Sequence, residues 1–151
     1  MTSTEQRIPA ASRPLTDGVL IETDVLCDFL VARNSCLRKV LGLYPCYTTV
    51  INASELFAIG KDDAERNAMM ALLSGIRVLG LHPKYALKIG EIARNNRARG
   101  MKERDAIVIG TAIASRLPIV TEAWAEKYKG YGGVRVVSQS EMTNTRVNVQ
   151  I

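Results

Sequence analysis

Short apolar runs alternate with longer segments of helical periodicity along most of this chain. The apolar runs occupy residues 18–21, 46–48, 76–81, 118–120 and 134–137. A short continuous apolar run is typical of a strand buried on both faces, as the strands of parallel sheets are. Strands that alternate with helices predict an α/β fold, with a mainly parallel sheet of four to five strands and helices on both faces.

The segments between these runs carry apolar side chains at helical spacing. One helix is predicted to begin at residue 24, and others to cover residues 35–43, 50–59, 62–73, 84–96 and 104–116. Gly60 follows the helix at 50–59, where glycine is a common C-cap. The helix at 104–116 is apolar on almost every side, which is typical of a helix packed at the centre of a domain.

The chain has 151 residues, which is enough for one domain with a substantial core. We expect that domain to cover residues 18–138. Residues 1–17 are polar, contain Pro9 and Pro14, and show no periodicity, so they are predicted to form a flexible N-terminal extension. Residues 139–151 are rich in Ser, Thr and Asn and are predicted to form a tail or an added edge strand.

The composition of the chain limits the partners that it can be expected to bind and the compartment in which it is expected. The formal net charge of +5 favours polyanionic partners, nucleic acid among them. The three cysteines have no C-x-x-C spacing and the chain has one histidine, so a zinc site is not indicated and reduced thiols are expected. No apolar run approaches the roughly 20 residues of a membrane span, and the N-terminus lacks the apolar core of a signal peptide. We therefore expect a cytoplasmic protein that does not associate with membranes.

Acidic residues follow several of the predicted strands. They are Glu22 and Asp24 after the first strand, Glu55 after the second, Asp105 at the start of the buried helix, and Glu122 and Glu126 after the fourth strand. The carboxyl ends of parallel strands form one crevice, so these side chains are expected to gather there. Carboxylates that gather need a cation or raised pKa values, and oxygen ligands suit Mg²⁺ or Mn²⁺. Such ions support phosphodiester hydrolysis, although each acid alone also suits a helix N-terminus.

Four blocks of the sequence, in order, resemble the PIN-domain family. They are an apolar strand running into Glu-Thr-Asp-Val-Leu (19–30), a Glu-Leu pair followed by Gly (47–60), an Asp that begins a helix of small residues (104–112), and Pro-Ile-Val-Thr followed by Tyr and Gly-Val-Arg-Val (118–136). The resemblance implies a metal-dependent endoribonuclease of the VapC toxin type, with Mg²⁺ or Mn²⁺ held by acids. It also implies RNA as substrate, a cognate antitoxin and a homodimer.

The resemblance assigns the site residues by position. Glu55 and Asp105 match the second and third acids of the family. Glu22 stands where the family has Asp, and its extra methylene displaces the carboxylate in a way that octahedral Mg²⁺ tolerates poorly. Asp24 occupies a position where Asn or Asp is usual and is an additional expected metal ligand.

The fourth acid has two candidates, because counting from Thr121 points to either Glu122 or Glu126. Glu126 is preferred, which makes the predicted catalytic set Glu22, Glu55, Asp105 and Glu126. Basic residues precede Asp105 and are expected to hold an RNA backbone beside the metal. The predicted nucleic-acid-binding residues are Arg97, Arg99, Lys102 and Arg104.

Two other functions use the same residues. One is a PIN-fold module that binds RNA or a protein and has an impaired metal site, which Glu22 and the ambiguous fourth acid favour. The other is a doubly wound phospho-acceptor or nucleotide-binding domain. That domain predicts a lysine after a late strand or a glycine-rich phosphate loop, and the sequence has neither.

Overall fold

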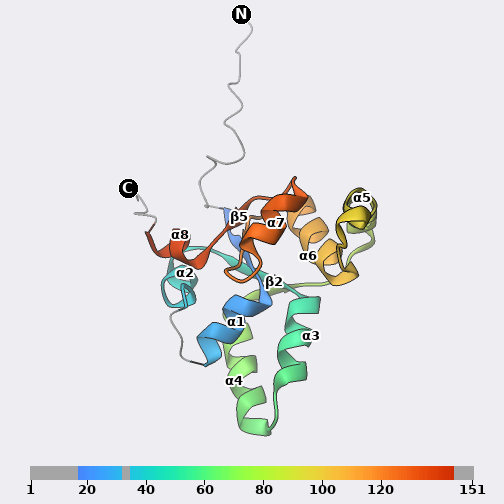
Figure 1. The fold of residues 1–151 in the computed structure, drawn as a ribbon. Helices are drawn as coiled ribbons and strands as arrows, with labels where there is room; N and C mark the ends of the chain where they lie inside the picture. Colours follow the sequence, from blue (N-terminus) through green and yellow to red (C-terminus); the bar gives the residue numbers. More distant parts are fainter. Residues whose placement is uncertain (1–16, 32–34, 145–151) are drawn as a thin grey trace, which may run out of the picture.

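Five parallel strands form one sheet at the centre of the protein (Figure 1). The computed structural model describes residues 17–31 and 35–144. The strands are β1 (Val19–Ile21), β2 (Cys46–Thr49), β3 (Arg77–Leu79), β4 (Ile119–Val120) and β5 (Val136–Val137), in the spatial order β3-β2-β1-β4-β5. Each strand overlaps one of the five apolar runs, so the predicted α/β fold with a parallel sheet is confirmed.

Strand β1 lies in the middle of the sheet. Its Val19 is opposite Cys46 of β2, and its Leu20 is opposite Ile119 of β4. All three residues of β1 are fully buried, which explains why this segment is apolar without alternation. The residue that follows β1 therefore lies at the centre of the carboxyl edge of the sheet.

Helices cover both faces of the sheet, as predicted. They are α1 (Thr23–Leu30), α2 (Leu37–Leu43), α3 (Val50–Ile59), α4 (Asp63–Leu73), α5 (Ala86–Asn96), α6 (Glu103–Ala114), α7 (Ala125–Tyr131) and α8 (Gln139–Asn144), with short 3₁₀ turns at Pro83–Tyr85 and Arg97–Arg99. Val19 and Ile21 belong to an apolar cluster with residues of α1 to α4, whereas Leu20 belongs to a second cluster with residues of α5 to α7. The two faces of β1 thus contribute to two separate halves of the core.

Two helices differ from the sequence-based expectation. Residues 139–144 form α8, where a tail or an edge strand was predicted. The side chain of Gln139 accepts a hydrogen bond from Cys36 N (3.0 Å) and donates one to Asp28, and Met142 is buried, so α8 is held against α1 and α2. Helix α7 was not predicted at all. The N-terminal extension lies outside the described residues except for Asp17.

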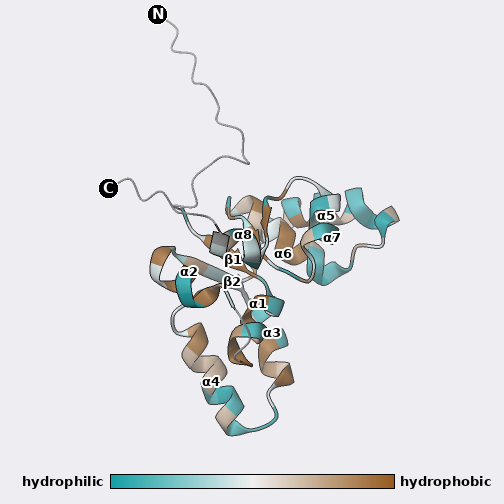
Figure 2. Ribbon diagram, turned by 60° about the vertical axis from the view of Figure 1, so that its left-hand side comes forward, coloured by the Kyte–Doolittle hydropathy of each residue, from teal (hydrophilic) through white to brown (hydrophobic). Residues whose placement is uncertain are grey.

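Helices α3 and α4 lie side by side and project from the sheet, and hydrophobic residues run along most of α3 (Figure 2). Several of these side chains are exposed, namely Val50, Phe57, Ile59 and, on α4, Met70. Within the part of the chain that is described, no helix combines the length and the apolar character that crossing a bilayer requires.

Candidate functional site

Three acidic side chains from three different elements meet at the carboxyl edge of the sheet. Glu22 follows β1 and is the N-cap of α1, where its Oε1 accepts a hydrogen bond from Thr23 N at 2.9 Å. Glu55 lies on α3 and Asp105 in the first turn of α6. The Glu22 side chain is fully buried, Asp105 is 5% exposed and Glu55 is 37% exposed. We call Glu22, Glu55 and Asp105 the carboxylate cluster.

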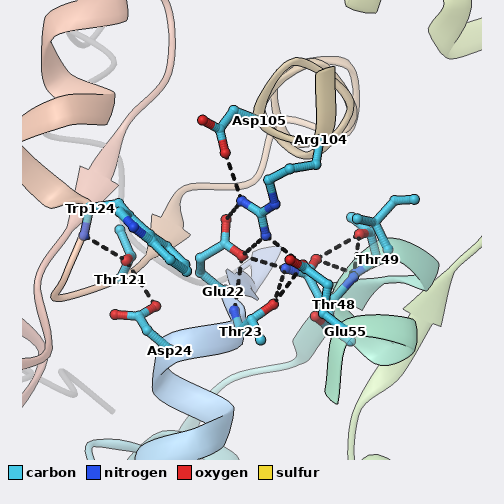
Figure 3. A network of polar contacts seen from close by, with 12 residues as sticks. Glu22, Thr23, Asp24, Thr48, Thr49, Glu55, Arg104, Asp105, Thr121 and Trp124 are labelled. Carbon is cyan, nitrogen blue, oxygen red and sulfur yellow. Dashed lines mark hydrogen bonds and ion pairs between the residues drawn. The ribbon is translucent and has the colours of Figure 1, made fainter. Parts of the chain in front are cut away.

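The guanidinium of Arg104 lies between these three carboxylates (Figure 3). Its Nη2 is 2.7 Å from Glu22 Oε1 and 2.6 Å from Glu55 Oε1. Its Nη1 is 2.8 Å from Asp105 Oδ1 and 3.1 Å from Glu22 Oε2. The cluster therefore converges on one cationic group, and that group belongs to the chain itself.

Neutral donors fix the carboxylates around Arg104. Asn52 receives hydrogen bonds on its amide oxygen from Thr49 N (3.1 Å) and Thr49 Oγ1 (2.6 Å), which turns its amide nitrogen towards Glu22 Oε1, to which it donates. Thr23 Oγ1 donates to Glu55 Oε1 at 3.0 Å. Thr23 lies in the first turn of α1 and Asn52 in the first turn of α3, so the starts of these two helices orient the cluster.

The hydroxyl of Tyr128 completes the buried side of the cluster. It lies 2.7 Å from Glu22 Oε2 and 3.2 Å from Asp105 Oδ1, and it accepts a hydrogen bond from Arg104 Nη1 at 2.7 Å. Burial, followed by the negative charge of Glu22, raises the pKa of Tyr128, so the phenol stays a neutral donor.

Two positive charges face the three acids. Burial alone would lower the pKa of Arg104, but the hydrogen bonds and charge of Glu22, reinforced by the other two carboxylates, raise it instead. Lys127 Nζ lies 3.3 Å from Asp105 Oδ2. Its slight burial would lower its pKa, and the charge of Asp105 more than reverses this. The cluster is thus neutralised in large part by side chains of the protein.

Asp24 lies outside the cluster, although only one residue separates it from Glu22. Its Oδ1 accepts a hydrogen bond from Thr121 Oγ1 (2.9 Å), and its Oδ2 accepts from the backbone N–H groups of Glu122 and Ala123, both at 2.8 Å. Figure 3 shows this side chain turned towards Thr121 and away from Arg104. Asp24 therefore ties α1 to the loop after β4, because its position in the first turn of α1 faces that loop.

Neither candidate for the fourth acid contacts the cluster. The side chain of Glu126 is 94% exposed and lies 3.8 Å from Lys129. Helix α7 buries Ala125, Tyr128 and Tyr131, which leaves Glu126 on its solvent face. Glu122 Oε2 accepts a hydrogen bond from Gln139 N at 2.9 Å.

The predicted nucleic-acid-binding residues divide into two groups. Arg97, Arg99 and Lys102 are exposed on the turn that leads into α6, and Arg99 also donates to the carbonyl of Gly130. Arg104 is only 22% exposed and points into the cluster. Its place within the acids is the main feature that the sequence did not indicate.

Three further residues of the site were not assigned a role from the sequence: Asn52, Lys127 and Tyr128. Asn52 had a detectable signal, because it stands three residues after Thr49 in a capping box and three before Glu55, on the same side of α3. Tyr128 and Lys127 reach Asp105 from a helix more than twenty residues away in sequence. Tyr128 is the tyrosine of the fourth sequence block, which gave it a place in the resemblance but no role, and no local pattern marks Lys127.

The donor set of the cluster consists of carboxylate oxygens, which suits a hard divalent ion such as Mg²⁺ or Mn²⁺. Among residues 17–31 and 35–144, however, no three His, Cys, Asp or Glu side chains are arranged to hold a metal ion. The guanidinium of Arg104 contacts the oxygens that would be ligands. The acids therefore fit a divalent ion on the condition that Arg104 leaves its position.

Several solved structures that share this fold come from toxin–antitoxin systems. One chain of the DNA-bound VapBC complex of Salmonella typhimurium is 17% identical and has a TM-score of 0.71, with 82% of this chain and 99% of that chain covered. VapBC-1 of nontypeable Haemophilus influenzae gives 13% identity and a TM-score of 0.69, covering 81% and 98%. A chain of a toxin–antitoxin complex of Klebsiella pneumoniae is 21% identical and has a TM-score of 0.64, with 80% of this chain and 96% of that chain covered.

These likenesses establish the class of fold. The chain has the α/β PIN-domain fold that its four sequence blocks implied, in the form found in VapC-like proteins. No protein-family model matches the chain, and no curated protein is similar to it in sequence.

Proposed function

We propose that this protein is the toxin-type member of a VapBC-like pair and an endoribonuclease that hydrolyses RNA at the carboxylate cluster with Mg²⁺ or Mn²⁺. The observation that carries the proposal is the convergence of Glu22, Glu55 and Asp105 on one cationic point at the carboxyl edge of the sheet. Ligand sites of open α/β sheets lie at this edge. Three carboxylates from separate elements repel one another unless a cation lies between them, and the proposed divalent ion would occupy that position.

In the proposed reaction, Glu22, Glu55 and Asp105 would hold the divalent ion in place of Arg104. The ion would supply activation of the attacking water and neutralisation of charge on the leaving oxygen. Asn52 and Thr23 keep the Glu22 and Glu55 carboxylates in place through the hydrogen bonds described above. Such supporting contacts limit the motion of the acids, which matters because ligand geometry governs the activity of such sites.

Exposed basic side chains near the cluster are the proposed contacts of the RNA backbone. Lys127 stands directly beside Asp105, and Arg97, Arg99 and Lys102 are exposed on the turn before α6. Phosphate contacts of this kind position a nucleic acid without selecting its sequence. The proposed substrate is therefore RNA held by its backbone, in keeping with a net charge of +5.

The proposed partners are an antitoxin and a second copy of the chain. The structural neighbours are toxin–antitoxin complexes, which supports an antitoxin. For the homodimer we propose the exposed apolar side chains of α3 and α4, of which Ile59 is 53% and Met70 60% exposed. Light scattering tests this assignment: Met70→Glu should shift the protein towards the monomer, and an unchanged mass would exclude Met70 from the interface.

All three cysteines are free, in keeping with the proposed cytoplasmic location.

Cleavage of a mixed RNA pool with Mg²⁺ or Mn²⁺ tests the proposed activity. Asp105→Asn should abolish metal-dependent cleavage, because it removes a charged ligand from the cluster. Asp63→Asn is the matched control, since it makes the same change on α4 at a side chain that is 93% exposed. Cleavage that is equal in wild type and Asp105→Asn, or that does not need metal, would exclude this mechanism.

A PIN-fold binding module with an impaired metal site is the second candidate, and one observation favours it. Arg104 and Lys127 already neutralise most of the negative charge of the cluster. Wild-type protein that binds RNA, measured by filter binding, but does not cut it with either ion would favour this candidate over the nuclease.

A further inference from the structure

We propose that Arg104 is a built-in competitor for the divalent ion, so that the ion binds only when the guanidinium leaves the carboxylate cluster. The inference concerns the regulation of the site proposed above and rests on that proposed function. Its test is chosen so that the two can fail separately.

Arg104 and a divalent ion would need the same space. Arg104 contacts both oxygens of Glu22, one of Glu55 and one of Asp105, at 2.6–3.1 Å. Mg²⁺ binds carboxylate oxygens at about 2.0–2.1 Å and demands near-octahedral geometry. An ion that used these four oxygens would fall on the volume of the guanidinium. The two cations therefore exclude one another sterically as well as by like charge.

The charges around Arg104 are not fully balanced. Three carboxylates face Arg104 and Lys127, which leaves one negative charge without a partner in the cluster. A divalent ion in place of Arg104 would balance the three acids together with Lys127. The electrostatics therefore favour the exchange, while the paired hydrogen bonds of Arg104, which are shorter and stronger than neutral ones, oppose it.

The side chain of Arg104 can reach solvent from its place in the cluster. Its side chain is 22% exposed, and Nε is buried without a hydrogen-bond partner among the described residues. A buried unsatisfied donor is a cost that disappears when the group reaches water. The guanidinium carbon lies 5.2 Å from the ring of Trp124, which stands beside the cluster (Figure 3). Rotation about the side-chain bonds of Arg104 can open the site without moving α6.

Mn²⁺ affinity, measured by isothermal titration calorimetry on the full chain, tests the competition. Arg104→Gln should bind Mn²⁺ at least tenfold more tightly than wild type. Arg66→Gln is the matched control, since Arg66 is 46% exposed on α4 and pairs with Asp63. It removes the same charge far from the cluster and should bind as wild type does. Equal affinity in wild type and Arg104→Gln, or no binding to either, would overturn the inference.

A second readout does not depend on the variant being stable. Trp124 is the one tryptophan of the chain, and Arg104 lies against its ring. Titration of wild-type protein with Mg²⁺ should change the Trp124 emission as the guanidinium departs. Saturable Mg²⁺ binding that leaves this emission unchanged would contradict displacement of Arg104. Thermal unfolding adds a check, because Mg²⁺ should raise the melting temperature of Arg104→Gln more than that of wild type.

RNA cleavage in the same samples separates the inference from the proposed function. If Arg104→Gln binds Mn²⁺ tightly and yet cuts no RNA, the competition stands and the nuclease fails. If wild type binds Mn²⁺ as tightly as Arg104→Gln and cuts RNA, the nuclease stands and the competition fails.

Discussion

Glu22 and Asp24 are separated by one residue, yet they serve different parts of the molecule. Glu22 is fully buried and lies against a cation, whereas Asp24 accepts hydrogen bonds from the loop after β4. Both follow the same central strand, so nearness to the crevice does not decide the role of an acid. The role follows from which groups face the side chain: a guanidinium in one case, two backbone N–H groups and a hydroxyl in the other.

The largest effect is expected from replacing the first of these acids by its amide. Glu22→Gln should reduce metal-dependent RNA cleavage by more than the roughly 10–100-fold that loss of a supporting residue costs at metal sites. The reason is that Gln cannot supply the charge that a divalent ion requires. Initial cleavage rates at saturating Mg²⁺ measure this. A cleavage rate within twofold of the wild-type rate would show that Glu22 is not a ligand of the metal.

The same chemical change at Asp24 should act on stability. Asp24→Asn weakens the link between α1 and the loop after β4, where the carboxylate accepts three hydrogen bonds. We expect the free energy of unfolding to fall by about 1–3 kcal/mol, as measured by urea denaturation. Unchanged stability together with lost cleavage would instead make Asp24 a metal ligand and erase the contrast with Glu22.

The Tyr128 hydroxyl, which contacts Glu22 and Asp105, is a titrating group of a kind that the contacts of Asp24 lack. The pKa of Tyr128 is raised from its ordinary value of 10 in the folded protein. Its contribution to stability is therefore fully present below pH 10 and is lost as pH rises above that value, because only the unfolded state releases the proton. The loss should approach about 1.4 kcal/mol per pH unit, and Tyr128→Phe should lack it. Parallel unfolding curves for the two proteins between pH 9 and pH 11 would contradict this.

The smallest effect is expected at Glu126. Glu126→Gln should change the free energy of unfolding by less than about 0.5 kcal/mol, because its side chain is exposed and its ion pair with Lys129 is long. Cleavage should also stay at the level of wild type. Loss of cleavage without loss of stability would show that Glu126 reaches the metal in the complex with RNA.

Sequence patterns predicted the sheet and part of the site. The apolar runs identified all five strands, because burial on both faces leaves a mark in the sequence itself. Glu22, Glu55 and Asp105 could be grouped because parallel strands end at a common edge. The sequence did not predict that Arg104, in place of a metal ion, lies between these acids. Arg104 and Glu22 are 82 residues apart, so no local pattern links them.

The wrong expectations for α8, Asp24 and Glu126 also result from contacts between residues that are distant in sequence. Helix α8 is held by the contact between Gln139 and Cys36, which are 103 residues apart, so its polar sequence indicated a tail. Asp24 and Glu126 each follow a strand, as expected, but the helix that carries each one turns its side chain away from the cluster. Which side of a helix faces the cluster depends on how the helix packs in the folded protein, and the local sequence does not determine this.

The pairing of β1 with β4 has a consequence for synthesis of the chain. Leu20 of β1 meets Ile119 of β4, so the middle of the sheet remains open until residue 119 has been synthesised and can pair. The loop that Asp24 binds and the Tyr128 hydroxyl that lies against Glu22 come later still. A nascent chain that stops before β4 therefore cannot close the sheet at whose edge the acids meet, and one that stops before Tyr128 lacks the hydroxyl on the buried side of the carboxylate cluster.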